Sequence, residues 1–451
     1  MQNEIINKVC ILVSCPLLVF WAGVLGFGYP GIMNSYWKEE FNVGNSETGL
    51  VITFMMVAVA ISMFISGRIY AKMGLYFCIV AGTVFYSVAF LFLFLAKSIV
   101  LIYIWGFLVN FGFSFLYGPS LTTVQTAFPN KRGLVSGFLN FVLGISAAIM
   151  SPILNSTLNG KGYTFTNILV FILIIISNVV AFLLLIFSNK NKTKKMNKID
   201  TSKDLTVKEA LKTKEFWALW LLWAFMGAAG ISMVSLSKTY SVVIGETSVI
   251  ILTIFNLANG ICRLFIGWFT DRIGGRFTGA ISFLLTTVGY LVMPHTSNVT
   301  LICICAVGVG IGLGALFTVS GPLTSLIFGF KEFGMIFGLL YTGYGIIGGV
   351  VGPFVSGLVL EKTNDNYIIV FTYLGIMAFI GFLSILIVND KKKESKSSTF
   401  NKEKSLNMNL IEGELNSIPE KQYENTPDGN SLDIKKGQLS ESDIINVKVD
   451  C

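Results

Sequence analysis

The stretch VIILTIFNLANGICRLFIGWFTDRIGGR, residues 249–276, joins an apolar segment to a compact charged turn. The apolar segment is long enough to cross a bilayer as a helix, which takes about 20 residues. Arg263 lies inside it and is the only charged residue deep within any apolar span of the chain. A guanidinium near the membrane midplane costs about 2.5–3.5 kcal/mol on insertion scales, so it needs a partner. A bound anion is the natural functional candidate.

The composition argues against a soluble protein. Of the 451 residues, 53% are hydrophobic and only 13% are charged. That small share of charge leaves no polar coat for a globule of this size, and the apolar residues fall in long blocks instead. The seven Cys are scattered and the chain has one His, so we expect no disulfide framework, no metal site and no cofactor. The net charge of +8 is concentrated in loops, so we expect a lipid bilayer as the partner and no nucleic acid.

The apolar blocks predict an all-α membrane protein with twelve transmembrane helices. They cover residues 9–33, 47–67, 75–96, 98–124, 133–156, 166–188, 216–241, 248–270, 275–294, 299–322, 333–360 and 366–389. Between these spans, seventeen Lys and Arg fall on one side of the membrane and five on the other, nine of the seventeen between Lys190 and Lys214. Basic loops stay in the cytosol, so we expect both termini there.

Matching residues at a nearly constant spacing indicate that the chain is a duplicated unit. Gly67 is matched by Gly267, Gly118-Pro119 by Gly321-Pro322, Gly133 by Gly334 and Pro152 by Pro353, at offsets of 200 to 203. Ser46-Glu47-Thr48 is echoed by Gly245-Glu246-Thr247 at an offset of 199. We therefore expect two six-helix halves with pseudo-symmetry, at residues 1–188 and 216–390. A basic cytosolic linker, 189–215, joins them, and a polar tail, 391–451, is expected to be disordered and cytosolic.

The turn Gly267-Trp268-Phe269-Thr270-Asp271-Arg272-Ile273-Gly274-Gly275-Arg276 resembles the inner-loop signature of the major facilitator superfamily. The matching turn of the first half has Ala71 where that family has Asp. Further stretches resemble one branch, the oxalate:formate antiporters and monocarboxylate porters: Tyr117-Gly118-Pro119, Phe128–Gly133, Lys214–Trp217, Asn259-Gly260-x2-Arg263 and Tyr341–Gly345. The resemblance covers about residues 20–390 and implies the major facilitator fold.

The branch resemblance implies that Arg263 binds the carboxylate of the substrate. The planar fork of an Arg suits a carboxylate bidentately. The alternative is a structural Arg that reaches toward the cytosolic face or bonds to main-chain carbonyls of a neighbouring helix. Two departures bear on the substrate. Tyr344 stands where the dicarboxylate exchanger of the branch has Lys, which favours a monoanion, and Asn259 stands where proton-coupled porters have Asp, which favours uniport or exchange.

Aromatic and charged residues complete the predicted sites. Tyr29, Tyr117 and Tyr344 are candidates to line the substrate pocket, and ordinary packing between helices is the alternative for each. At the cytosolic ends we expect an inner gate formed by Gly267, Asp271, Arg272 and Arg276. In this gate Gly267 would permit close approach of span 333–360. The alternative is that the cations only mark topology.

We therefore expect a transporter of small organic anions, most readily monocarboxylates of the lactate, pyruvate or formate type, that works by alternating access and needs no oligomer. Two other classes stay open: a transporter of another small solute such as an amino acid, sugar or drug, and a non-transporting receptor on a transporter fold. An enzyme is not expected, because the spans carry no nucleophile, metal cluster or paired carboxylates. We favour the plasma membrane over an organelle membrane.

Overall fold

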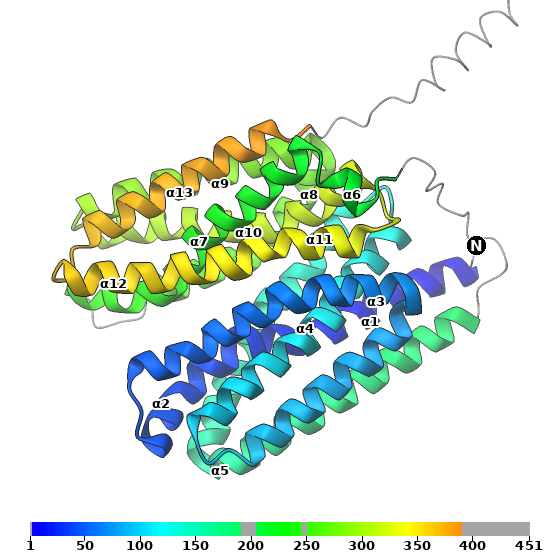
Figure 1. Ribbon diagram of the computed structural model, residues 1–451, viewed down its shortest axis with the longest axis horizontal. Helices are drawn as coiled ribbons and strands as arrows, with labels where there is room; N and C mark the ends of the chain where they lie inside the picture. Colours follow the sequence, from blue (N-terminus) through cyan, green and yellow to red (C-terminus); the bar gives the residue numbers. More distant parts are fainter. Residues whose placement is uncertain (1, 191–203, 246–249, 390–451) are drawn as a thin grey trace, which may run out of the picture. The chain divides into compact units, whose positions relative to one another are not determined.

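The computed structural model describes residues 2–190, 204–245 and 250–389 (Figure 1), and in these ranges it consists of helices and short connections. The predicted tail, 391–451, residues 191–203 of the predicted linker and the residues Glu246 and Thr247 of the repeat lie outside the described residues. The first half consists of α1 (Gln2–Gly23), η1 (Val24–Gly28), α2 (Tyr29–Phe41), α3 (Asn45–Phe94), α4 (Ile99–Ala127) and α5 (Arg132–Lys190).

The short helix α6 (Val207–Ala210) lies near the end of the linker, and six spans of the second half follow it. These are α7 (Lys214–Val243); α8 (Ile250–Ile273); α9 (Gly275–Val292) with η2 (Met293–His295); α10 (Val299–Phe328); α11 (Phe333–Thr342) with η3 (Gly343–Gly348), η4 (Val350–Phe354) and α12 (Val355–Lys362); and α13 (Tyr367–Ile387). The two halves form two bundles, the first blue to cyan and the second green to orange in Figure 1.

The number of membrane crossings follows from two bent helices. In the described part of the chain, ten helices are long and apolar enough to cross a membrane. Two of them, Glu47–Phe94 and Arg132–Phe187, have 48 and 56 residues, which is enough for two crossings each. They bend at Gly74 and Gly162, whose φ angles of 77° and 82° favour glycine. The ten helices therefore give twelve crossings, and the predicted all-α fold is confirmed.

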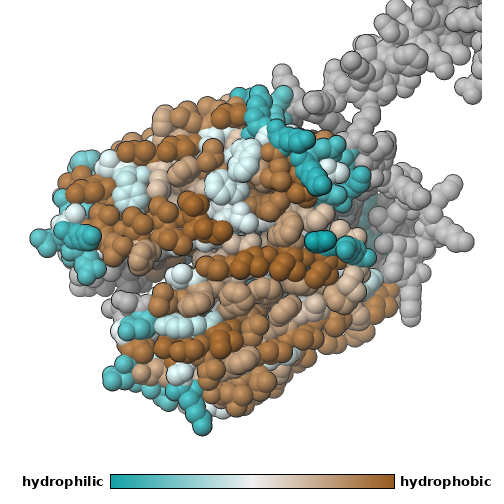
Figure 2. Space-filling model, in the orientation of Figure 1, coloured by the Kyte–Doolittle hydropathy of each residue, from teal (hydrophilic) through white to brown (hydrophobic). Residues whose placement is uncertain are grey.

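The surface has the pattern of a membrane protein. Figure 2 shows a broad apolar band across the visible face of the bundles and hydrophilic residues gathered at their two ends. Apolar side chains such as those of Leu183, Phe265 and Ile304 are more than half exposed, as expected where the solvent is lipid. We call the end at which α1 begins the inner end, because the positive-inside rule assigns it to the cytosol.

The two halves contact each other along two pairs of helices, α5 with α8 and α3 with α11. At the inner end of the first pair, a Cβ on Gly267 would lie 2.4 Å from the main-chain oxygen of Gly133. At the inner end of the second, a Cβ on Gly67 would lie 2.1 Å from the main-chain oxygen of Gly334. These glycines permit main chain to touch main chain, so the inner ends of the halves are closed against each other.

The partner predicted for Gly267 was wrong. This residue faces Gly133 and Gly137 of α5 and not span 333–360, whose glycines Gly334 and Gly338 face Gly67 and Phe64 of α3. The two contacts have matching positions in the two halves. The repeat shows which residues correspond, but it does not show which helix each of them touches.

Candidate functional site

Arg263 lies in α8 with its side chain only 1% exposed. Its Nε donates to the main-chain oxygen of Asn259 at 3.0 Å, and its Nη2 donates to Oδ1 of the same residue at 3.0 Å. Its Nη1 donates across the boundary between the halves to the main-chain oxygen of Asn140, at 2.9 Å. In this conformation the guanidinium therefore does bond to a carbonyl of a neighbouring helix. Three of its five N–H groups are used in these bonds.

Asn140 of α5 connects Arg263 to the rest of the site. Its side chain is fully buried. Its Oδ1 accepts a hydrogen bond from the hydroxyl of Tyr117 at 2.9 Å, and its Nδ2 donates to the main-chain oxygens of Ser136 at 2.9 Å and Phe317 at 3.2 Å. One residue thus holds a hydroxyl of the first half and a guanidinium of the second in fixed positions.

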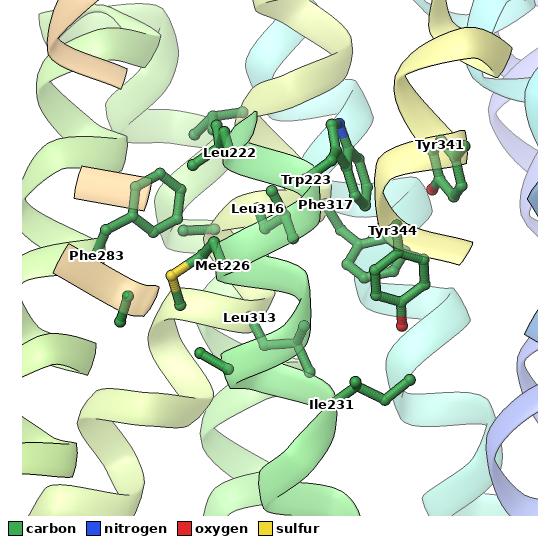
Figure 3. Packing of buried hydrophobic residues seen from close by; sticks show 14 of the residues in the cluster. Leu222, Trp223, Met226, Ile231, Phe283, Leu313, Leu316, Phe317, Tyr341 and Tyr344 are labelled. Carbon is green, nitrogen blue, oxygen red and sulfur yellow. The ribbon is translucent and has the colours of Figure 1, made fainter. Parts of the chain in front are cut away.

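Aromatic rings form the wall opposite these bonds. The Cζ of Arg263 lies 5.0 Å from the ring centre of Phe317, within range of a cation–π interaction. The rings of Trp223 and Tyr341 lie 4.3 Å apart, and the ring of Tyr344 lies 5.6 Å from those of Trp223 and Phe317. Figure 3 shows these four side chains gathered between α7 and α11. Tyr341 and Tyr344 both lie within electrostatic range of the guanidinium.

This cluster contains more hydrogen-bond donors than acceptors. The Nε1 of Trp223 is buried without a hydrogen-bond partner in the described part of the chain, and the buried hydroxyl of Tyr341 faces the hydroxyl of Tyr117. Arg263 adds two further N–H groups. Among the described residues, the groups that interact with the guanidinium include no carboxylate. A buried donor without an acceptor costs about 1–3 kcal/mol, so an acceptor-rich anion is the chemical complement of this site.

The geometry brings together four of the five predicted pocket residues, which are Arg263, Asn259, Tyr117 and Tyr344. It does not bring Tyr29 to them. The hydroxyl of Tyr29 donates to Oδ1 of Asn167, and its ring packs on Trp37 and Trp105 inside the first half. Tyr29 directly follows the π-helical turn η1 (Val24–Gly28), and such a turn rotates the side chains after it relative to a regular α-helix. Tyr29 is therefore a core residue here.

Sequence reasoning missed four members of the site: Asn140, Trp223, Phe317 and Tyr341. Asn140 carried a usable signal, since it is a polar side chain in the middle of an apolar span. The other three carried none. They are aromatic residues in a chain with 38 Phe, 15 Tyr and 7 Trp, so their type alone does not separate pocket from core.

The four residues predicted for the inner gate lie where α8 and α9 meet at the inner end. Both carboxylate oxygens of Asp271 accept main-chain N–H groups at the start of α5, from Gly133 at 2.7 Å and Leu134 at 2.8 Å. The guanidinium of Arg272 lies over the ring of Trp268 at 4.7 Å, and Arg276 follows in the first turn of α9. The carboxylate of Asp271 thus caps a helix of the other half, where the helix dipole favours negative charge.

Comparison with known proteins assigns the chain to a family. The model of the Major Facilitator Superfamily matches residues 17–252 and 240–420. The oxalate:formate antiporter of Oxalobacter formigenes is 27% identical over 264 residues, which cover 57% of this chain and 62% of the antiporter's length. The agnestins efflux protein of Paecilomyces divaricatus is 24% identical over 394 residues, covering 84% and 85%.

The solved structures agree on the fold. A transporter of the same superfamily, FucP in the outward conformation, superimposes with a TM-score of 0.63 and 16% identity, covering 86% of this chain and 99% of that one. Identity this low carries information on the fold alone. The family model, however, covers most of both membrane halves. The chain belongs to the major facilitator superfamily.

Proposed function

We propose that the protein transports small organic anions by alternating access, as a secondary active or facilitative carrier, and that Arg263 binds the substrate carboxylate. The observation that carries this proposal is the excess of buried donors around Arg263. Two N–H groups of Arg263 and the Nε1 of Trp223 have no acceptor among the described residues. A carboxylate brings up to four acceptor positions and a compensating charge.

Within this class we propose a preference for monocarboxylates. A monocarboxylate neutralises Arg263, and the loaded site then holds no net charge. A dicarboxylate leaves a second carboxylate beside Tyr344, a neutral side chain that is 3% exposed. Burying an ion without a counter-ion costs several kcal/mol. The relative whose name gives both oxalate and formate as substrates supports a small carboxylate, and the single cation here favours the monoanion.

We further propose that transport is uniport or exchange and not proton symport. Asn259 is the side chain that holds the guanidinium from within α8, through its Oδ1. An amide cannot take up a proton in the physiological pH range, whereas a carboxylate at the same place could. The hydrogen bond orients Arg263 without linking its charge to pH.

The basic-residue asymmetry supports an orientation with both termini and the linker in the cytosol, and we place the protein in the plasma membrane. The two halves and their shared site are contributed by one chain, so the mechanism needs no oligomer. The internal repeat supports the division into two membrane halves joined by the basic linker, and the composition of residues 391–451 supports a polar tail.

Transport by the purified full chain in proteoliposomes tests the proposal. Vesicles loaded with an unlabelled acid should accumulate labelled lactate, pyruvate or formate faster than empty vesicles if the carrier exchanges. Binding of these acids without flux would indicate a receptor. Flux of neutral or much larger compounds alone would indicate another substrate class, to which the resemblance to an agnestins efflux protein points.

A further inference from the structure

The end of the linker is hydrogen-bonded to the connection between α10 and α11. Oδ2 of Asp204 accepts main-chain N–H groups of Phe330 at 2.8 Å and Lys331 at 3.0 Å. Beside it, the N–H of Leu205 donates to the main-chain oxygen of Phe328 at 3.0 Å. A Cβ on Gly329, whose φ is 82°, would lie 2.0 Å from Cγ of Asp204. The carboxylate therefore occupies the space that any other residue at 329 would fill.

In a second hydrogen bond the acceptor lies on the connection and the donor lies on the linker. Oε2 of Glu332 accepts the main-chain N–H of Val207 at 2.6 Å, so the connection also caps the start of α6. Thr206 and Glu209 close the other bonds of this turn as a reciprocal capping box. The bonds from Thr206 lower the pKa of Glu209 below its usual value. The segment 204–209 is thus tied to the connection 328–332 by carboxylates from both sides.

The bonds of Asp204 and Glu332 lie near the start of α11, and the first half has Ala71, not an acid, at the position that matches Asp271. In the second half, Asp271 follows Gly267 by one helical turn and caps the start of α5. In the first half, Ala71 follows Gly67 by the same turn, and Gly67 packs against Gly334 at the start of α11. An alanine offers no acceptor. The carboxylates at this corner come from the linker and from the connection itself.

The connection between α10 and α11, together with the end of α10, also contacts the first half. Arg132, the first residue of α5, donates through Nη1 to the main-chain oxygen and Oγ of Ser325 in α10, at 3.3 and 3.4 Å. Its guanidinium lies 4.6 Å from the ring centre of Phe330. It also interacts electrostatically with Asp204 and Asp271. The hydrogen bond from Phe330 to Asp204 therefore also fixes the ring on which Arg132 packs, and Arg132 connects the first half to the second.

We propose that residues 204–209 are a latch that stabilises the conformation with closed inner ends, and that Asp204 fixes the connection before α11 as Asp271 fixes the start of α5. The linker is then a structural part of the gate and not only a tether. When the inner ends separate, Arg132 leaves Phe330. Loss of the latch should shift the equilibrium toward that open conformation. The inference does not depend on the identity of the substrate.

The test is the distance between the halves in the full chain. Spin labels at Met73 of α3 and Phe277 of α9, both exposed at the inner end, report opening by double electron–electron resonance on a background without native cysteines. Because hydrogen bonds to a charged group are among the stronger ones, Asp204→Asn should raise the ratio of open to closed molecules by about tenfold. Asp365→Asn is the matched control. Asp365 is exposed with a φ of 58°, a conformation that Asn tolerates well.

Rescue distinguishes a latch from general damage. Ala71→Asp added to Asp204→Asn supplies a carboxylate at the position matching Asp271 and should restore most of the closed population. If Asp204→Asn does not fold, Glu332→Gln, which weakens the second bond, should still open the inner ends. A distance distribution in these variants equal to that of Asp365→Asn overturns the proposal, as does opening that Ala71→Asp leaves uncorrected.

Discussion

Gly267→Ala would place a methyl group in the contact that closes the inner ends. Its Cβ would lie 2.4 Å from the main-chain oxygen of Gly133 and 3.0 Å from the Cα of Gly137. Both neighbours are main chain of the other half, so neither can rotate out of the way. Ordinary Cβ contacts begin at 3.4 Å, and the distance from this Cβ to the oxygen of Gly133 would be 2.4 Å. The helices α5 and α8 must therefore separate by about 1 Å, the difference between the two distances.

The effect should fall on one conformation of the carrier. Overpacking a close contact costs about 1–3 kcal/mol. Opening the inner ends separates α8 from α5 and relieves the clash, so the cost applies to the closed conformation alone. The ratio of open to closed molecules should therefore rise by about 5- to 150-fold.

The assay is the alkylation rate of a cysteine at Gln125, on a background without native cysteines. Gln125 is buried beside Gly321 across the boundary between the halves, so a reagent reaches it only when the inner ends open. Gly160→Ala is the control, since a Cβ there meets no atom within 4 Å. Equal alkylation in Gly267→Ala and Gly160→Ala would refute the idea that this glycine contact holds the gate shut.

Three further predictions follow from the charges. Tyr344→Lys adds a second cation beside Arg263 and should raise the affinity for oxalate or malonate relative to acetate or lactate in a competition assay; Tyr344→Phe should leave the ratio unchanged. Asp271→Asn weakens the cap on α5 and should slow transport while binding at equilibrium stays nearly intact; unchanged transport would mean that the charge only marks topology. A cysteine at Asn159 should be labelled from outside and one at Lys195 from the cytosol, and the reverse pattern would contradict the topology.

The fold could be predicted from the sequence because its causes are local. Apolar blocks of about 20 residues predict spans wherever they occur. The twelve crossings appear even where Gly74 and Gly162 join two of them into one long helix. The duplication matched Gly67 with Gly267, and both residues make a close contact with main chain of the other half, at Gly334 and Gly133.

The helix neighbours could not be predicted in the same way. The sequence gives no distance between α8 and α5, so Gly267 was assigned to the wrong partner. Tyr29 was misplaced because its direction depends on the π-helical turn Val24–Gly28 before it and on how the helix is rotated against its neighbours. In both cases the missing information concerns how helices pack against each other, which one sequence does not contain.

Part of the site could be predicted, because a charged side chain in an apolar span is conspicuous and an aromatic one is not. A charge in an apolar span is expensive, so Arg263 stood out from its surroundings, whereas Asn259 was found through the family resemblance. Trp223, Phe317 and Tyr341 are apolar enough to be ordinary core, and only their position around the guanidinium distinguishes them. Asp204 lies in a stretch with nine Lys, which predicts only a cytosolic loop, and its bonds to Phe330 and Lys331 appear only in three dimensions.

Binding of a labelled monocarboxylate to Arg263→Gln is the most direct test of the role of Arg263. The variant keeps a polar side chain but loses the charge and the fork, and Arg263→Lys keeps the charge alone. We predict that Gln nearly abolishes saturable binding, that Lys weakens it, and that Arg68→Gln, the same substitution at an exposed side chain, leaves it unchanged. Normal binding and transport by a folded Arg263→Gln protein would contradict the anion site, because Arg263 would then be a structural residue.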